Sequence, residues 1–139
     1  MKKPVMLSIE GRQSYMGQEP EVIELVTAGT LEETSQGWIV SYEETDLTGM
    51  AGVTTTFLVE EGKLTLTRTG RLNSQMVFQE GVTHDSLYEM EFGALMLSVC
   101  AKKIRANITP DGGVIDLTYG IEIEQTDAGT IEYHLQITA

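Results

Sequence analysis

The sequence predicts an all-β protein in which about eight to ten short antiparallel strands form a single closed or nearly closed barrel. Three observations support this fold. Apolar and polar residues alternate along most of the 139 residues, the alternating segments are rich in Val, Ile, Thr, Tyr and Leu, and turns that contain Gly separate them. Because each strand has one apolar face, one shared interior must bury all of these faces.

The strands are predicted in order from this alternation. The first six lie at residues 5–14, 22–33, 38–44, 53–60, 63–69 and 75–80. A long apolar stretch follows from 87 to 108, but its apolar positions change from odd to even numbers at Lys102 and Lys103. A one-residue slip turns a strand inside out, so a bulge or short break is expected there. The clearest alternation, at 115–123, and its repeat at 131–137 complete the set.

The predicted turns contain Gly where a hairpin needs a positive φ angle. These turns lie at 35–37, 61–62, 111–113 and 127–129. No linker, internal repeat or low-complexity segment interrupts the alternation, so residues 1–139 are predicted to form one domain.

Charge and hydropathy argue against several classes of partner. The 9 Lys and Arg residues are outnumbered by 21 Asp and Glu residues, and the net charge of −12 repels phosphate backbones and anionic lipids. The longest uncharged run, 92–101, is about half of the ~20 residues needed to cross a bilayer. Lys2 and Lys3 lack the following apolar stretch of a signal peptide, and the single Cys100 cannot form an intrachain disulfide. These observations predict a cytoplasmic protein that binds neither nucleic acid nor membranes.

Five segments resemble a known family by their order and spacing. They are Tyr-Glu-Glu at 42–44, Leu-Thr-Leu-Thr-Arg-Thr-Gly at 64–70, Met-Val-Phe at 76–78, Tyr88 followed by Phe-Gly at 92–93, and the hairpin at 113–119. In these segments the chain resembles the YwiB-like family of uncharacterised bacterial proteins along nearly its whole length. The resemblance implies a calycin-type barrel, related in architecture to lipocalins and fatty-acid-binding proteins. It implies no established activity, since a fold alone does not confer one.

The most informative sequence feature is a predicted row of polar side chains inside the barrel. A two-residue turn at 61–62 pairs Thr55 with Arg68, and the loop at 45–52 brings Tyr42 opposite Thr55. Glu44 follows one pleat away on the same face, and Trp38 lies on that face at the other end of its strand. A guanidinium is costly to bury unless it is paired and hydrogen-bonded.

Two interpretations of Arg68 remain open. In the first, Glu44, Tyr42 or a backbone carbonyl forms hydrogen bonds with Arg68, which then closes one end of the barrel. The general rule that buried ion pairs are often structural favours this interpretation. In the second, Arg68 and Tyr42 bind the carboxylate of an amphipathic ligand that enters an apolar cavity. The candidate ligand-binding residues are Arg68, Tyr42, Glu44, Trp38 and Thr55.

The remaining reactive side chains indicate no catalytic or metal site. His84 lies in a predicted turn region, and Cys100 is interpreted as a small buried apolar residue. If the turn at 127–129 pairs Thr126 with Thr130, His134 faces outward opposite Glu122, in a solvated acidic surface that lacks an enclosed set of metal ligands. No zinc spacing, phosphate-binding loop, nucleophile elbow or dinucleotide fingerprint is present. No cofactor, no metal and no enzymatic activity are therefore predicted.

Three functions are compatible with these features. The first is a non-catalytic barrel that binds a small apolar or amphipathic molecule in its interior. The alternative is an interaction or scaffold barrel that can form a homodimer, has a side-chain-filled core without a ligand, and uses an edge or the Met-containing loop at 46–52. An enzyme has the least support, and would need His84, Cys100 or His134 to be buried together in a pocket. The volume of any internal cavity decides between the first two.

Overall fold

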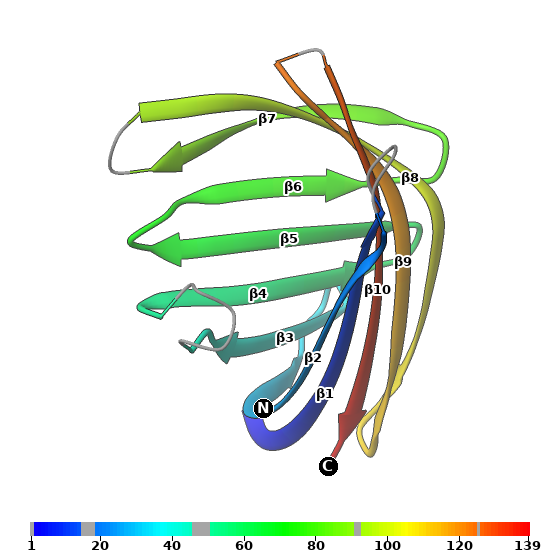
Figure 1. The fold of residues 1–139 in the computed structure, drawn as a ribbon. Helices are drawn as coiled ribbons and strands as arrows, with labels where there is room; N and C mark the ends of the chain where they lie inside the picture. The colour runs from blue at the N-terminus through cyan, green and yellow to red at the C-terminus, as the bar shows by residue number, and fades with distance from the viewer. Residues whose placement is uncertain (1, 15–18, 46–50, 91–92, 125) are drawn as a thin grey trace.

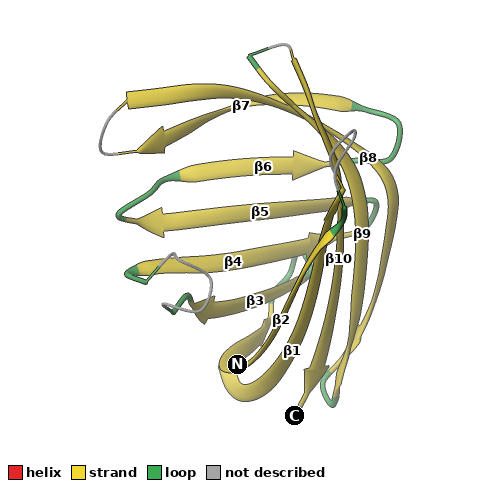
Figure 2. Ribbon diagram, viewed as in Figure 1, coloured by secondary structure: helices red, strands yellow, loops and turns green. Residues whose placement is uncertain are grey.

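The computed structural model describes residues 2–14, 19–45, 51–90, 93–124 and 126–139. This part of the chain forms ten strands and no helix (Figure 2). The strands are β1 (Lys2–Ser14), β2 (Glu21–Glu33), β3 (Trp38–Glu43), β4 (Val53–Glu60), β5 (Lys63–Gly70), β6 (Ser74–Phe78), β7 (Thr83–Met90), β8 (Gly93–Thr109), β9 (Gly112–Ile123) and β10 (Thr126–Thr138).

All ten strands belong to one antiparallel sheet with the order β6-β5-β4-β3-β2-β1-β10-β9-β8-β7. Strands β3 to β6 cross the long strands β1, β8, β9 and β10 steeply, so the sheet curls around its apolar face (Figure 1). The first strand pairs with the last, which joins the two halves of the curl. The predicted all-β, nearly closed antiparallel barrel is therefore confirmed.

A short series of backbone contacts closes the curl where its two edge strands meet. Asn73 and Glu89 exchange hydrogen bonds of 3.0 and 2.9 Å at one end of this seam. At the other end the Gly81 amide donates to the Ala101 carbonyl at 3.0 Å, and Gln79 bridges to Val82. Between these points β6 and β7 have no further ladder pairs among the described residues.

The inward face of every strand supplies the core, as the alternation predicts. In β4, for example, the odd-numbered residues from Val53 to Val59 are buried and the even-numbered ones are half-exposed. The alternation in the sequence predicts an inward-facing set of residues, and all its members lie in the core cluster or pack against it: Ile9, Leu25, Trp38, Val40, Phe57, Leu64, Leu66, Phe78, Leu97, Leu117, Ile121, Tyr133 and Leu135. The middle of the barrel is consequently filled by side chains.

The predicted break at Lys102 and Lys103 is a β-bulge, because the pairing of β8 with β9 shifts register between Ala101 and Lys103. The stretch at 87–108, in contrast, was predicted as one interrupted strand and is two. Its first part belongs to β7, which begins at Thr83 and therefore also includes His84, predicted to lie in a turn region. The polar sequence at 83–86 hides this strand from an alternation argument.

The predicted register of the last hairpin is wrong. Thr126 pairs with Ile123 and not with Thr130, so the chain reverses before Thr126 instead of after it, and Glu124 adopts a φ of 51° beside that reversal. Gly129, with a φ of 117°, lies instead at a register shift within β10. His134 consequently pairs with Asp116 and not with Glu122. A Gly with positive φ serves a bulge as well as a turn, and sequence alone does not separate the two.

Close packing between β1, β2 and β3 leaves room for no side chain at Gly29. A Cβ atom at this position would lie 2.6 Å from both Leu7 Cδ1 and the Ser41 carbonyl oxygen. We expect Gly29→Ala to lower the free energy of unfolding by about 1–3 kcal/mol, because the Ser41 backbone cannot move away cheaply. Gly120→Ala is the matched control, since its nearest neighbour beyond the adjacent residues is Lys102 Cε at 3.7 Å. Urea unfolding of both variants measures the difference, and equal stabilities would contradict this packing.

Candidate functional site

Three neighbouring strands place the predicted polar row at one end of the barrel. Tyr42 on β3 pairs with Thr55 on β4, and Thr55 pairs with Arg68 on β5, as the turn lengths predict. Glu44 follows directly after β3, where its amide donates to the Val53 carbonyl at 2.8 Å. All four side chains are buried, with Thr55 completely inaccessible.

Hydrogen bonds from Thr55 and Tyr42 hold the Glu44 carboxylate. Thr55 Oγ1 donates to Glu44 Oε2 at 2.6 Å, and the Tyr42 hydroxyl donates to the same carboxylate. Burial, with the nearby Tyr133 and Glu44, raises the pKa of Tyr42 far above its ordinary value, although Arg68 acts in the opposite direction. Tyr42 is therefore a neutral hydrogen-bond donor throughout the physiological pH range.

Arg68 is only partly satisfied by its neighbours. Its side chain is 9% exposed, and Arg68 Nη2 donates to the Tyr133 hydroxyl at 3.2 Å. Its Nε atom is buried and has no hydrogen-bond partner within the described parts of the chain. Burial alone would lower the pKa of Arg68, but Tyr133, Tyr119, Tyr42 and Glu44 together raise it, so the guanidinium stays charged.

A second buried donor lies next to Arg68. Ser74 on β6 is the direct cross-strand partner of Arg68, and both side chains point into the barrel. Ser74 Oγ is buried and, among the described residues, has no hydrogen-bond partner. Directly opposed side chains on one sheet face have Cβ atoms about 5 Å apart, so the two unsatisfied groups are neighbours.

Arg68 lines a cavity of about 240 Å³ at this end of the barrel. Its lining combines an apolar wall from β1, β2 and β10 with the polar groups of β3 and β5. The lining residues are Ile9, Gly11, Gln13, Ile23, Leu25, Tyr42, Glu44, Arg68, Tyr88, Ile131 and Tyr133. Gly11 follows Leu7 and Ile9 on the inward face of β1, and a Cβ atom at this position would meet nothing within 4 Å.

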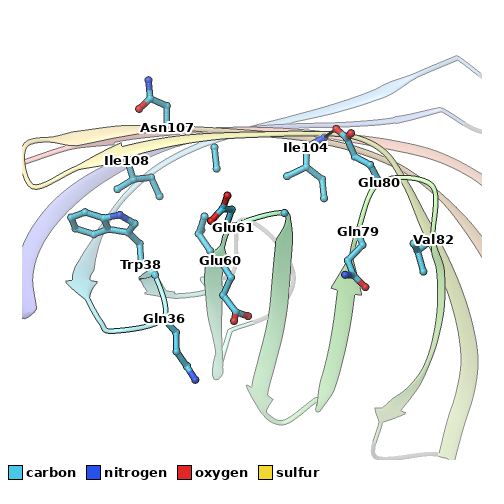
Figure 3. A pocket seen from close by; sticks show the side chains of 14 residues that line it. Gln36, Trp38, Glu60, Glu61, Gln79, Glu80, Val82, Ile104, Asn107 and Ile108 are labelled. Carbon is cyan, nitrogen blue, oxygen red and sulfur yellow. Dashed lines mark hydrogen bonds between the residues drawn. The ribbon is translucent and has the colours of Figure 1, made fainter.

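The structure brings together four of the five predicted site residues and separates the fifth. Arg68, Tyr42 and Glu44 line the cavity, and Thr55 donates a hydrogen bond to Glu44. Trp38 lies four residues before Tyr42 on β3, about 13 Å away at ~3.3 Å per residue. It lines a different and larger groove at the opposite end of the barrel (Figure 3).

Four further residues shape this site and are not among the predicted site residues: Gly11, Ser74, Tyr88 and Tyr133. Tyr133 belongs to the predicted inward set, but its hydrogen bond with Arg68 connects residues that are 65 positions apart in the sequence. Gly11 carries a usable signal, because a Gly at an inward position of an alternating strand leaves space. Ser74 reaches the site through the pairing of β5 with β6, opposite Arg68, whereas Tyr88 on β7 reaches it across the seam between the two edge strands.

The residues weighed for catalysis do not meet in a pocket. His84 is half-buried and its Nε2 atom hydrogen-bonds Gln79 Oε1 at 2.8 Å. Cys100 is also half-buried, but it alternates with the inward Val99 and so lies on the outer face of β8. His134 is on the outer face of β10, where its Nδ1 atom forms a hydrogen bond with the Asp116 carboxylate.

No group of three or more His, Cys, Asp and Glu side chains within the described ranges is arranged to hold a metal ion. The described part of the chain also contains no helix with the length and apolar character that a membrane crossing requires. The loop at 46–52, considered above for protein contacts, lies mostly outside the described residues.

The fold and the cavity together define a small, nearly closed β-barrel with a polar-ended internal pocket. The chain belongs to the family described as "Domain of unknown function (DUF1934)", which matches residues 7–137. It is 30% identical over 121 residues to the uncharacterized beta-barrel protein YwiB of Bacillus subtilis (strain 168), covering 86% of this chain and 82% of that protein. The crystal structure of the ywiB protein from Bacillus subtilis matches with a TM-score of 0.84 and 23% identity, over 99% of this chain and 94% of the other. The resemblance noted from the five sequence segments is thus confirmed.

The raised pKa of Tyr42 predicts a loss of stability at alkaline pH. The unfolded chain releases the Tyr42 proton near its ordinary pKa of about 10, whereas the folded chain retains it. The stabilisation is therefore complete below about pH 10 and is lost as the pH rises above it, at up to about 1.4 kcal/mol per pH unit. Tyr42→Phe removes this contribution. Urea unfolding from about pH 9 to about pH 11 measures the slope, and identical slopes in the two proteins would contradict the assignment.

Proposed function

We propose that this protein is a non-catalytic binding barrel for a small amphipathic anion. In this proposal the anionic group, such as a carboxylate, meets Arg68, and the apolar part of the ligand lies against Ile9, Leu25 and Ile131. The observation that carries the proposal is that Arg68 lines a largely apolar cavity, while its buried Nε atom has no hydrogen-bond partner among the described residues.

The energetics of Arg68 favour a ligand over a purely structural plug. A buried donor without a partner costs about 1–3 kcal/mol, and more when the group is charged. Glu44 is already held by Thr55 and Tyr42, and the hydrogen bond that Arg68 makes to Tyr133 leaves Nε unused. An anion in the cavity that accepts from Arg68 would satisfy this guanidinium with charge-assisted hydrogen bonds.

The size of the cavity limits the ligand. Ligand sites in proteins typically enclose roughly 300–1,000 Å³, and this cavity holds about 240 Å³. Large side chains such as Phe57 and Leu66 are buried in the barrel next to the row and are not part of the cavity lining. The proposal is consequently a short amphipathic molecule and not a long-chain lipid that threads the barrel.

A series of straight-chain carboxylates from butanoate to dodecanoate tests this proposal by isothermal titration calorimetry. Affinity should rise with each added methylene, by up to about 0.8 kcal/mol, until the cavity is full, and the matched alcohols should bind at least about tenfold more weakly. Native mass spectrometry of the freshly purified protein provides an independent search for a co-purified molecule. Equal binding of acids and alcohols would overturn the role of Arg68.

Two variants that each remove one charge from the site test whether the ligand is an anion. Arg68→Met should weaken carboxylate binding by about tenfold or more, because it removes the buried donor. Glu44→Gln should strengthen binding, because it removes a negative charge beside the ligand while its amide oxygen can still accept from Thr55. The opposite order of affinities would contradict an anion site at Arg68, and circular dichroism checks that both variants fold.

A cavity-filling variant tests the location without touching the polar row. Gly11→Leu places a side chain into open space on the cavity wall, so the fold should be kept while the ligand is excluded. Loss of carboxylate binding with an unchanged or raised melting temperature is expected. Retained binding in a folded Gly11→Leu protein would place the ligand elsewhere.

A further inference from the structure

The second half of β8 has an open edge. Strand β7 pairs with β8 only from Gly93 to Cys100, and beyond the bulge residues 103–109 pair with β9 on one side. No other strand among the described residues lies along the free side of this segment. An exposed edge presents backbone donors and acceptors that another extended chain can use.

One hydrogen bond shows which backbone groups face outward from this edge. The Ile104 amide donates to Glu80 Oε1 at 2.8 Å, so it points away from β9 and toward the seam. Backbone groups alternate direction along a strand, and those of Ala106 and Ile108 therefore point the same way. Neither residue has a hydrogen-bond partner on this side within the described parts of the chain.

The open edge forms one wall of a groove of about 830 Å³, at the end of the barrel opposite to Arg68. Figure 3 shows Ile104 and Ile108 on the side of β8 that faces Trp38, and Asn107 on the other side. The opposite wall comes from the β2–β3 and β4–β5 turns and from the turn after β6. The open edge of β8 and the apolar side chains of the groove, which include Trp38, Ile104 and Ile108, thus lie side by side.

The groove is acidic. Glu60, Glu61 and Glu80 line it, and no Lys or Arg is among its lining residues. Glu61 extends from the β4–β5 turn toward β8 in Figure 3. The basic residues of β8, Lys103 and Arg105, alternate with Ile104 and so lie on the outer face of that strand. A basic partner therefore fits this surface electrostatically.

We propose that this groove binds an extended segment of a partner protein that adds a strand to β8 at Ile104–Ile108. Backbone hydrogen bonds to Ala106 and Ile108 would supply affinity, while the partner side chains on the groove-facing side of the added strand, apolar beside Trp38 and basic beside the glutamates, would supply specificity. A second copy of this chain fits less well, because each copy carries a net charge of −12. The site is separate from the Arg68 cavity and does not depend on a ligand there.

A synthetic peptide that carries Lys and Val in turn on one face of an extended strand, with Thr at every position of the other face, tests this surface on the full-length protein. Its titration, followed by amide chemical shifts of the ¹⁵N-labelled protein, should shift the Ala106 and Ile108 amides most strongly. The same peptide with N-methylated alternate residues, which cannot pair along an edge, should bind at least about tenfold more weakly. The same peptide with Glu in place of each Lys should not bind measurably, because its acidic side chains would face Glu60, Glu61 and Glu80.

Ala106→Pro is the decisive variant. It removes the amide that faces the groove, and Pro is tolerated on edge strands because that amide has no partner in the sheet. Peptide binding should fall at least about tenfold, whereas Ala106→Ser, which keeps the amide, should bind normally. Glu61→Gln should weaken binding and reduce its dependence on salt.

Three results would overturn the proposal. They are equal binding of the N-methylated peptide, undiminished binding to a folded Ala106→Pro protein, and chemical shifts confined to the outer acidic face around His134. Sedimentation velocity of the protein alone adds a fourth. A dimer that Ala106→Pro dissociates would identify a second copy as the occupant and contradict the proposed partner.

Discussion

The inward and outward alternation of side chains, carried in register around one nearly closed sheet, is the constraint on which this structure depends. A slip of one residue anywhere would move a whole strand's apolar set to the solvent. The bulge at Lys102 preserves the alternation where the sequence itself changes parity. Val99 and Ala101 point inward before it, and Ile104 and Ile108 point inward after it. Both the Arg68 cavity and the acidic groove take their geometry from this register.

Within that constraint, tyrosines connect the apolar core to the polar end of the barrel. The Tyr133 ring contacts Phe57 edge to face at 6.1 Å between centroids, while its hydroxyl accepts from Arg68. Tyr119 packs against Phe78 at 4.5 Å in the same core. A buried ion is costly unless surrounding dipoles replace water. The tyrosines supply such dipoles and stabilise the guanidinium at the polar end of the barrel. The Nε donor of Arg68 still has no hydrogen-bond partner among the described residues.

Much of the fold and part of the site could be predicted from sequence, for identifiable reasons. The pairing of Thr55 with Arg68 follows from a two-residue turn and strict alternation, both local properties. The predicted register of the last hairpin was wrong because a Gly at position 129 is compatible with either a turn or a bulge, and both are local features. The contact of Arg68 with Tyr133 and the space beside Gly11 depend on the curl of the whole sheet. A sequence pattern carries no information on which strands that curl brings face to face.

The lengths of the strands explain why one end of the seam stays open. Strand β6 has 5 residues and β7 has 8, whereas β8 has 17. At ~3.3 Å per residue, β7 covers only about half of β8, and β6 turns into β7 before it can follow the remainder. Glu80 satisfies the first exposed amide of that remainder, at Ile104, and its length does not reach further along the edge. The open edge is therefore a property of the fold itself, and the glutamates around it determine the charge of the chain that can pair with it.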